Sequence, residues 1–288
     1  MRPSALPRMR DQLLQHLTDP TAPLRADTGT DNQPGLDAEA SRLRAAELFW
    51  VAPDMTALAV AAGDQLAAAR WASADRPSPS GLIVFDGGIG SFDSGGVQIP
   101  VEAISWGAED GALGIGLYLS RTRLAAEISQ LGTLEEDAVP PLVPLRSHTL
   151  PITPEPVAFA DLDPGIPTMV ATTLAAAWAL MQQVTLVDRR PAPADKSTAR
   201  AYARRQQPLP GVTIVDLRRA YVPDYREEEG ADPAGRRYRH RWVVTGHWRD
   251  QAHGPDRALR RRQWIPAYVK GPDGAPLLAT EKVNVWRR

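Results

Sequence analysis

The sequence contains no cysteine among its 288 residues. Without a thiol, the chain cannot form a disulfide framework, hold zinc or an iron–sulfur cluster through cysteine, or use a cysteine nucleophile. The absence fits a reducing compartment, and we therefore expect a cytoplasmic protein.

Long apolar runs are also missing. No stretch of about 18 apolar residues is present, so no membrane-spanning helix is predicted. The most apolar stretch, residues 169–187, is interrupted by Gln182 and Gln183 and is predicted to be a buried helix. No apolar signal-peptide core follows the basic residues of the first ten positions. We expect no membrane partner.

Common catalytic and cofactor-binding motifs are absent or incomplete. The Gly-x-Ser-x-Gly motif of a nucleophilic serine does not occur. The glycine-rich stretch Asp86–Gly90 is similar to a phosphate-binding loop, but such a loop must open a helix after a parallel strand. Because the next segment is predicted to be a strand, these glycines are predicted to occupy turn positions with positive φ. We expect no cofactor.

What the chain does contain is a globular composition with an uneven charge distribution. Apolar residues make up 43% and charged residues 23%, and the net charge is −1. Residues 1–188 hold 11 Lys and Arg against 23 Asp and Glu, whereas residues 189–288 hold 22 against 11. We therefore expect an acidic region, 1–188, and a basic C-terminal region, 189–288, within two domains or one continuous domain.

Hydrophobic periodicity predicts an α+β fold with N-terminal helices, a central antiparallel meander, one long central helix and a C-terminal three-stranded antiparallel meander. The predicted helices span residues 4–18, 37–50, 55–72, 123–131 and 167–188. The predicted strands span residues 81–86, 97–106, 112–119, 212–217, 239–249, 259–270 and 277–286. Residues 138–167 are expected to be extended because proline removes backbone donors, and residues 189–211 are expected to be a basic linker.

Arg, His and Trp are concentrated in residues 239–270. Aromatic rings beside guanidinium groups bind single-stranded nucleic acid by stacking and phosphate pairing, and they also anchor peptides. The alternative is that the Trp rings form a core covered by the Arg stems. The candidate binding residues are Arg239, Arg241, His247, Trp248, Arg249, Arg260, Arg262 and Trp264.

Alternation along the first of these strands places Trp242 and Trp248 on one face and His247 and Arg249 on the other. We therefore expect the Trp rings in the core and a separate basic face. That face is expected to carry Arg239, Arg241, His247, Arg249, Arg260 and Arg262.

His247 is the one candidate catalytic residue, as a general base or a phosphate contact. The alternative is a half-buried histidine that is hydrogen-bonded across the meander. A shared metal would need His240 and His247 on one side, but their odd separation places them on opposite faces of a regular strand. We expect no metal site.

The C-terminal block resembles the type V-A anti-CRISPR family whose characterised activity lowers the effector nuclease's mRNA during translation. The resemblance rests on Gly246-His247-Trp248, Gly254, the Arg run ending at Arg262, Trp264, Pro266-Ala267 and Val269. A weaker resemblance includes the strand at residues 83–86 and the helix at residues 168–187.

The resemblance implies a cytoplasmic regulatory protein of phages or other mobile elements that recognises a nascent peptide or acts near mRNA. The expected partner is a host protein or nascent chain, with RNA as a further candidate, and the oligomeric state stays open. Two alternatives remain: a nuclease or toxin-like enzyme that uses His247, and a virion structural protein with contacts through its Pro-rich segments.

Overall fold

The computed structural model describes residues 1–66, 70–127, 138–153, 155–162, 165–193, 195–218 and 242–270. The chain divides into two compact units, Met1–Arg219 and Ala220–Arg288. Both helices and strands contribute substantially, so the α+β class predicted from the sequence is confirmed.

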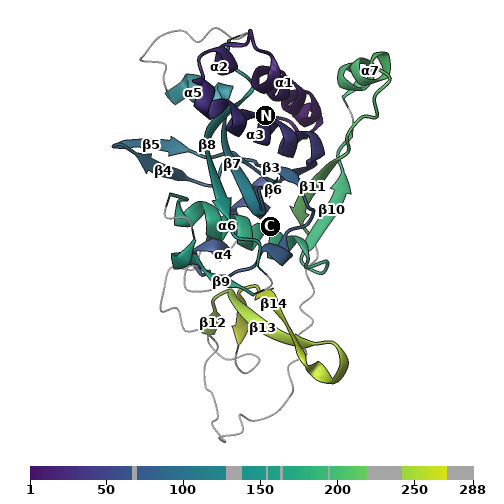
Figure 1. Ribbon diagram of the computed structural model, residues 1–288. Coiled ribbons are helices and arrows are strands. Elements are labelled where there is room, and N and C mark those ends of the chain that lie inside the picture. Colours follow the sequence, from purple (N-terminus) through teal and green to yellow (C-terminus); the bar gives the residue numbers. More distant parts are fainter. Residues whose placement is uncertain are drawn as a thin grey trace, which may run out of the picture. The chain divides into compact units, whose positions relative to one another are not determined.

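A seven-stranded sheet forms the centre of the first unit (Figure 1). β1 pairs in parallel with β3 and β11, and every other neighbour in the sheet is antiparallel. The strands, in spatial order, are β10 (Val187–Pro191), β11 (Val212–Leu217), β1 (Glu47–Val51), β3 (Gly81–Phe85), β6 (Ala103–Glu109), β7 (Ala112–Ser120) and β8 (Leu142–Leu150). The predicted central meander is present as β3, β6 and β7 within this larger sheet.

β1 corrects the prediction of a helix over residues 37–50. The helix α3 (Gln33–Ala45) ends before Glu47, and the chain then enters the sheet. Residues 48–51 are all buried, because β1 is a central strand covered on both faces. Such a strand is uniformly apolar, and a short uniformly apolar run carries no period that separates strand from helix.

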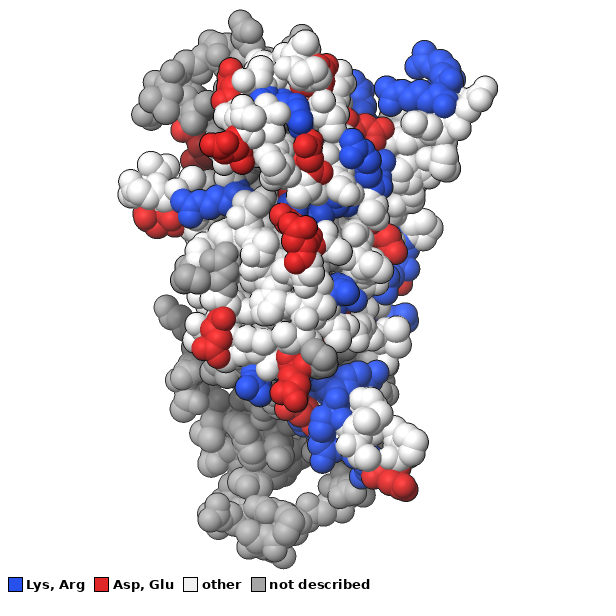
Figure 2. All heavy atoms as spheres, viewed as in Figure 1, with Lys and Arg blue, Asp and Glu red and all other residues white. Residues whose placement is uncertain are grey.

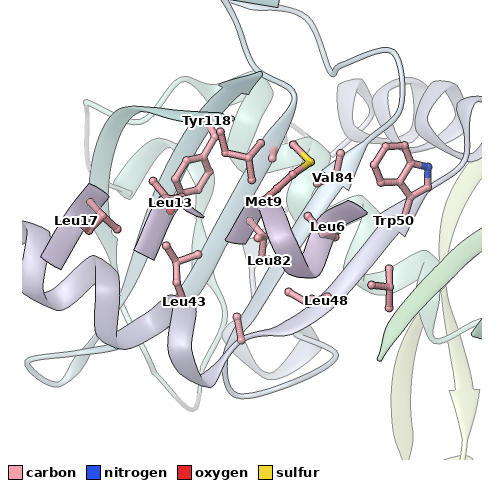
Figure 3. Packing of buried hydrophobic residues seen from close by; sticks show 14 of the residues in the cluster. Leu6, Met9, Leu13, Leu17, Leu43, Leu48, Trp50, Leu82, Val84 and Tyr118 are labelled. Atoms are coloured by element: carbon pink, nitrogen blue, oxygen red, sulfur yellow. The ribbon is translucent and has the colours of Figure 1, made fainter. Parts of the chain in front are cut away.

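The helices α1 (Leu6–Thr18) and α3 cover one face of the sheet. Leu6, Leu13 and Leu17 recur at helical spacing on α1 and are fully buried. They pack with Leu43 of α3 and with alternate residues of the sheet strands, among them Leu48, Trp50, Leu82, Val84 and Tyr118 (Figure 3). The helix predicted over residues 4–18 is therefore present and provides the core of this face.

The opposite face of the sheet is covered by α4 (Pro53–Asp64) and α6 (Thr168–Met181) (Figure 1). Phe49 stacks on Trp106, whose ring lies edge-on to Trp178 of α6, with centroids 5.8 and 5.2 Å apart. α6 is buried at every residue from Val170 to Met181, as expected for the most apolar stretch of the chain. Among the described residues, no helix is both long and apolar enough to cross a membrane.

The remaining elements are short. The loop Asp86–Gly90 joins β3 to the strand β4 (Ser91–Ser94), with positive φ at Gly87, Gly88 and Gly90, which confirms the turn prediction. The other helices and strands of the first unit are α2 (Pro23–Ala26), α5 (Arg121–Glu127), the pair β2 (Arg70–Trp71) with β9 (Val157–Ala158), the hairpin β4 (Ser91–Ser94) with β5 (Val97–Pro100), and the 3₁₀ turns η1 (Pro3–Ala5), η2 (Thr30–Asn32), η3 (Ser73–Asp75) and η4 (Phe159–Asp161).

The predicted extended stretch and the predicted basic linker both contain regular secondary structure. Part of the Pro-rich stretch, Leu142–Leu150, forms the edge strand β8 and pairs with β7. The predicted basic linker over residues 189–211 contains most of β10 and the helix α7 (Lys196–Arg204). An edge strand tolerates a proline such as Pro144 because one side of its backbone makes no ladder hydrogen bonds.

A buried arginine joins α3 to the sheet. The Arg42 guanidinium donates hydrogen bonds to the carboxylates of Glu39 and Glu109, and only 1% of its side-chain surface is exposed. The Ser105 hydroxyl donates to Glu39 at 2.9 Å, and the Tyr118 hydroxyl donates to Ser105 at 2.9 Å. Burial raises the pKa of Glu39, against the opposing effect of the Arg42 charge.

Three glycines in β6 and β7 make room for this network. A Cβ at Gly107 would lie 2.9 Å from Arg42 Cγ, and one at Gly114 would lie 2.0 Å from Glu109 Oε2. A Cβ at Gly116 would lie 2.7 Å from the Glu39 carboxylate. Since such contacts are closer than atoms pack in proteins, a side chain at any of these strand positions would displace members of the buried network.

The second unit contains a short strand pair and a longer hairpin. The pair is β12 (Trp242–Val244) with β15 (Tyr268–Lys270), and the hairpin is β13 (His247–His253) with β14 (Leu259–Ile265). The two long strands predicted here are each interrupted, at Thr245-Gly246 and at Pro266-Ala267. The strand predicted over residues 277–286 lies outside the described residues.

Candidate functional site

The β13–β14 hairpin gathers most of the candidate binding residues. Its register is regular over seven pairs, from His247 opposite Ile265 to His253 opposite Leu259. Because paired residues project from the same face of an antiparallel ladder, the register assigns every side chain to a face. The tryptophan face carries Trp248, Trp264, Asp250, Arg262, Ala252 and Arg260. The histidine face carries His247, Ile265, Arg249, Gln263, Gln251, Arg261, His253 and Leu259.

The tryptophan face is organised by one aromatic pair. Trp248 and Trp264 lie directly opposite each other, edge to face, with ring centroids 5.3 Å apart. Trp264 is buried, whereas Trp248 is half-buried. Gly246 lies against Trp264, since a Cβ at this glycine would come 2.7 Å from Trp264 Cζ2. The spacing of Gly-His-Trp and the later Trp therefore reflects a packing requirement.

The hairpin turn uses unusual backbone conformations. Gly254 has φ +78°, and Asp256 and Arg257 in the 3₁₀ turn η5 (Pro255–Arg257) also have positive φ. A Cβ at Gly254 would lie 2.9 Å from a methyl group of Leu259. This turn fixes which residues of β14 meet β13, and with them the face on which each arginine lies.

The register corrects the prediction of a single basic face. His247 and Arg249 do share a face, as predicted from alternation. Arg260 and Arg262, however, lie on the tryptophan face, opposite Ala252 and Asp250. Paired residues here are an even number of positions apart in the sequence, so the odd-numbered Arg249 and the even-numbered Arg260 and Arg262 lie on different faces. Alternation within each strand cannot reveal this register between the strands.

Both faces of the hairpin are basic. Residues 247–265 contain five Arg and two Asp, and Arg249, Arg260 and Arg261 are exposed. Lys and Arg side chains gather over the hairpin at the lower right of Figure 2. The hairpin thus presents guanidinium groups in two directions around a small aromatic core. Arg239 and Arg241, the remaining predicted members, lie outside the described residues.

His247 has a defined orientation. Its Nδ1 lies 3.1 Å from the carbonyl oxygen of Thr245, so Nδ1 carries a proton and donates to that oxygen. Both carboxylates of the hairpin lie elsewhere, Asp250 on the tryptophan face and Asp256 in the turn. Across the described ranges, no group of three His, Asp or Glu side chains is arranged to hold a metal ion.

The charge boundary does not coincide with the boundary between the compact units. The change from acidic to basic composition falls at residue 188, whereas the first unit extends to Arg219. Seven Lys and Arg and two Asp in residues 189–218 therefore belong to the otherwise acidic first unit. Sequence reasoning missed α7 in this stretch, although the cap sequence Asp195-Lys-Ser-Thr is typical of a helix start.

The fold and the hairpin define an α+β protein with an arginine-rich β-hairpin in a compact unit of its own. Comparison with protein families adds a match over a segment of the chain, residues 134–271, to the AcrVA2-like family, the anti-CRISPR type V subtype A2 family. The resemblance predicted for the C-terminal block is confirmed by this match. The matched segment includes α6, α7 and the hairpin, whereas the strand at residues 83–86 lies outside it. No curated protein matches the chain.

Proposed function

We propose that this protein is a regulatory protein of the anti-CRISPR kind that binds RNA through the β13–β14 hairpin. The match to an anti-CRISPR type V family supports the regulatory class. The observation that carries the binding site is the hairpin register, which surrounds the Trp248–Trp264 pair with exposed arginines on both faces. We further propose a cytoplasmic protein of phage or mobile-element origin that acts on a type V CRISPR system of its host.

Guanidinium groups around an aromatic pair suit a nucleic-acid strand. Arginine forms bidentate hydrogen bonds with phosphate oxygens, and the phosphate backbone supplies most of the affinity of such complexes. The half-buried ring of Trp248 offers a surface on which a base could stack. The buried ring of Trp264 supports Trp248 and is itself shielded from a ligand.

A nascent peptide is the rival partner, because Arg and Trp also anchor protein interfaces. The two partners respond differently to salt. Binding to phosphates releases counterions, so the logarithm of the affinity falls linearly with the logarithm of salt, with a slope of about −0.7 per phosphate for single strands. A peptide held mainly by Trp248 would show a much weaker dependence.

The test is binding of the purified full chain to labelled single-stranded RNA across a salt series, with wild type, Arg249→Gln/Arg261→Gln and Arg260→Gln. The double variant removes exposed charge from the histidine face, and the single variant removes it from the tryptophan face. Arg123→Gln is the matched control, since Arg123 is an exposed arginine of α5 that pairs with Glu127 at 3.0 Å.

We expect the double variant to lose about tenfold in affinity or more, and the salt slope to fall by roughly 0.7 for each lost phosphate contact. Arg123→Gln should bind like wild type. If wild type fails to bind RNA at low salt, or if all hairpin variants bind equally well, the RNA proposal is wrong and the peptide is the partner to pursue.

A further inference from the structure

The second concentration of exposed basic side chains lies on α7, far from the hairpin in sequence and within the first unit. α7 occupies the connection between the neighbouring strands β10 and β11 and stands at the end of this excursion (Figure 1). Lys and Arg side chains cover its outer side at the upper right of Figure 2.

The start of α7 is fixed by a side-chain cap. The Asp195 carboxylate accepts hydrogen bonds from the Thr198 backbone N–H and hydroxyl, both at 3.0 Å, and from the Ser197 hydroxyl at 2.5 Å. These hydrogen bonds lower the pKa of Asp195 to about 2, and the bond from the Ser197 hydroxyl has the largest effect. The Asp195 carboxylate is thus engaged by the helix's own backbone and hydroxyls.

One face of α7 is anchored to α1. Thr198 and Tyr202, one turn apart, are the buried residues of the helix. The Tyr202 hydroxyl accepts a hydrogen bond from the Arg10 guanidinium at 3.3 Å. Arg205, directly after the helix, lies 3.7 Å from the Asp11 carboxylate. These contacts fix the orientation of α7 about its own axis, and they therefore determine which side of the helix faces outward.

The outward face carries Lys196, Arg200 and Arg204, all exposed and spaced four residues apart. At 3.6 residues per turn, the centre of this row lies about 180° around the helix from the buried Thr198 and Tyr202. Successive members are separated by about 6 Å along the axis. Within the described part of the chain, none of the three forms an ion pair.

The composition of this face indicates the chemistry of its partner. Residues 196–211 contain four Lys or Arg and no Asp or Glu, so the positive charge is not neutralised within the segment. The buried residues of the helix, Thr198 and Tyr202, lie on the side that contacts α1 and are not available to a membrane or to the groove of another protein. Its aromatic residue, Tyr202, is buried and cannot stack on a base.

We infer that the outer face of α7, with Lys196, Arg200 and Arg204, is a second nucleic-acid contact that binds the phosphate backbone without reading base sequence. Three cations in a row meet successive phosphates of one strand; Arg200 and Arg204 supply bidentate hydrogen bonds, and Lys196 contributes a point charge. The α7 site does not include the hairpin, and the inference does not depend on the proposal that the hairpin binds RNA.

The test compares full-length wild type with Lys196→Gln/Arg200→Gln/Arg204→Gln in binding to labelled oligouridylate and oligoadenylate across a salt series. Arg205→Gln is the matched control, because Arg205 follows the same helix but faces Asp11. A charge-retaining variant, Arg200→Lys/Arg204→Lys, separates loss of charge from loss of helix structure. Single-stranded DNA of the same length distinguishes RNA from any phosphodiester strand.

We expect the triple variant to lower the magnitude of the salt slope by about 2, because three contacts at roughly 0.7 each are lost. Its affinity should fall 10- to 1,000-fold, equally for both base sequences, while Arg205→Gln and the lysine variant stay within about threefold of wild type.

The inference would be overturned if the triple variant bound nucleic acid as tightly as wild type, with an unchanged salt slope. It would also be overturned if wild type bound poly-glutamate as tightly as it binds nucleic acid. Failure of the hairpin proposal gives a different pattern. In that case, the Arg249→Gln/Arg261→Gln variant keeps wild-type affinity while the triple variant still loses it.

Discussion

Arg42 of the first unit and the arginines of the hairpin have opposite roles. Arg42 in the first unit is buried between Glu39 and Glu109 and ties α3 to the sheet. Arg249 and Arg261 in the hairpin are exposed on a two-stranded ladder with a single aromatic pair for a core. The first arginine is part of the interior, whereas the hairpin arginines are held out toward solvent.

The difference shows that the contribution of an arginine to stability depends on whether its guanidinium is buried or solvated. A buried guanidinium without its carboxylates, or buried carboxylates without their guanidinium, would lose both hydration and partners. An exposed guanidinium keeps its hydration whether or not a partner is present, so it adds little to stability and is available for binding. Three sets of substitutions test this comparison.

The largest effect is expected for Arg42→Met. The substitution leaves Glu39 and Glu109 without their shared cation, at a cost of about 3–5 kcal/mol in the free energy of unfolding. Arg249→Met, the matched change in the hairpin, should alter it by less than about 0.5 kcal/mol. Urea denaturation of the two variants measures both values, and similar losses would contradict the distinction.

An intermediate effect is expected for Trp264→Ala. Removal of this buried ring eliminates the aromatic pair and leaves a cavity beside Gly246, at a cost of about 3 kcal/mol to the hairpin. Trp248→Ala should cost less, because Trp248 is only half-buried.

Amide hydrogen exchange resolves where this loss occurs. Protection should fall in residues 247–265 and stay unchanged in β3, β6 and β7 of the sheet, since the two regions belong to different compact units. Equal loss of protection in the sheet would show that the two units unfold together.

The smallest effect concerns pH. Burial raises the pKa of Glu39 above its ordinary value of 4.5, so the folded chain binds this proton more tightly than the unfolded chain. The associated stability is present in full below pH 4.5 and is lost as pH rises through the folded-state pKa. Glu39→Gln should remove this dependence, with a change in slope of at most about 1.4 kcal/mol per pH unit. Urea midpoints of wild type and variant between pH 4 and 8 measure it, and parallel profiles would contradict the assignment.

Several elements follow from local sequence. The Leu spacing of α1, the uniformly apolar α6 and the glycines between β3 and β4 each depend on residues within one segment. The hairpin face shared by His247 and Arg249 also follows, because two residues two apart on one strand always point the same way. Helix spacing, turn positions and the face of a strand are set by neighbouring residues, so the local sequence pattern predicts them.

Other features depend on residues distant in sequence. Glu47–Val51 became a strand rather than the end of a helix because the sheet buries both of its faces. The outward face of α7 is set by contacts of Tyr202 and Arg205 with α1. Neither the strands that flank β1 nor the α1 residues that contact α7 can be identified from the local sequence pattern.

The sequence by itself determined the composition of this protein: the absence of thiol chemistry, the basic C-terminal region, and the Gly, His, Trp and Arg residues of its C-terminal block. Only the tertiary structure decided which charges are buried, as for Arg42, and which face outward, as for Arg260 on the tryptophan face of the hairpin. The physical reason is that burial and strand register arise from long-range packing, which brings together groups such as Arg42 and Glu109 that local periodicity cannot pair.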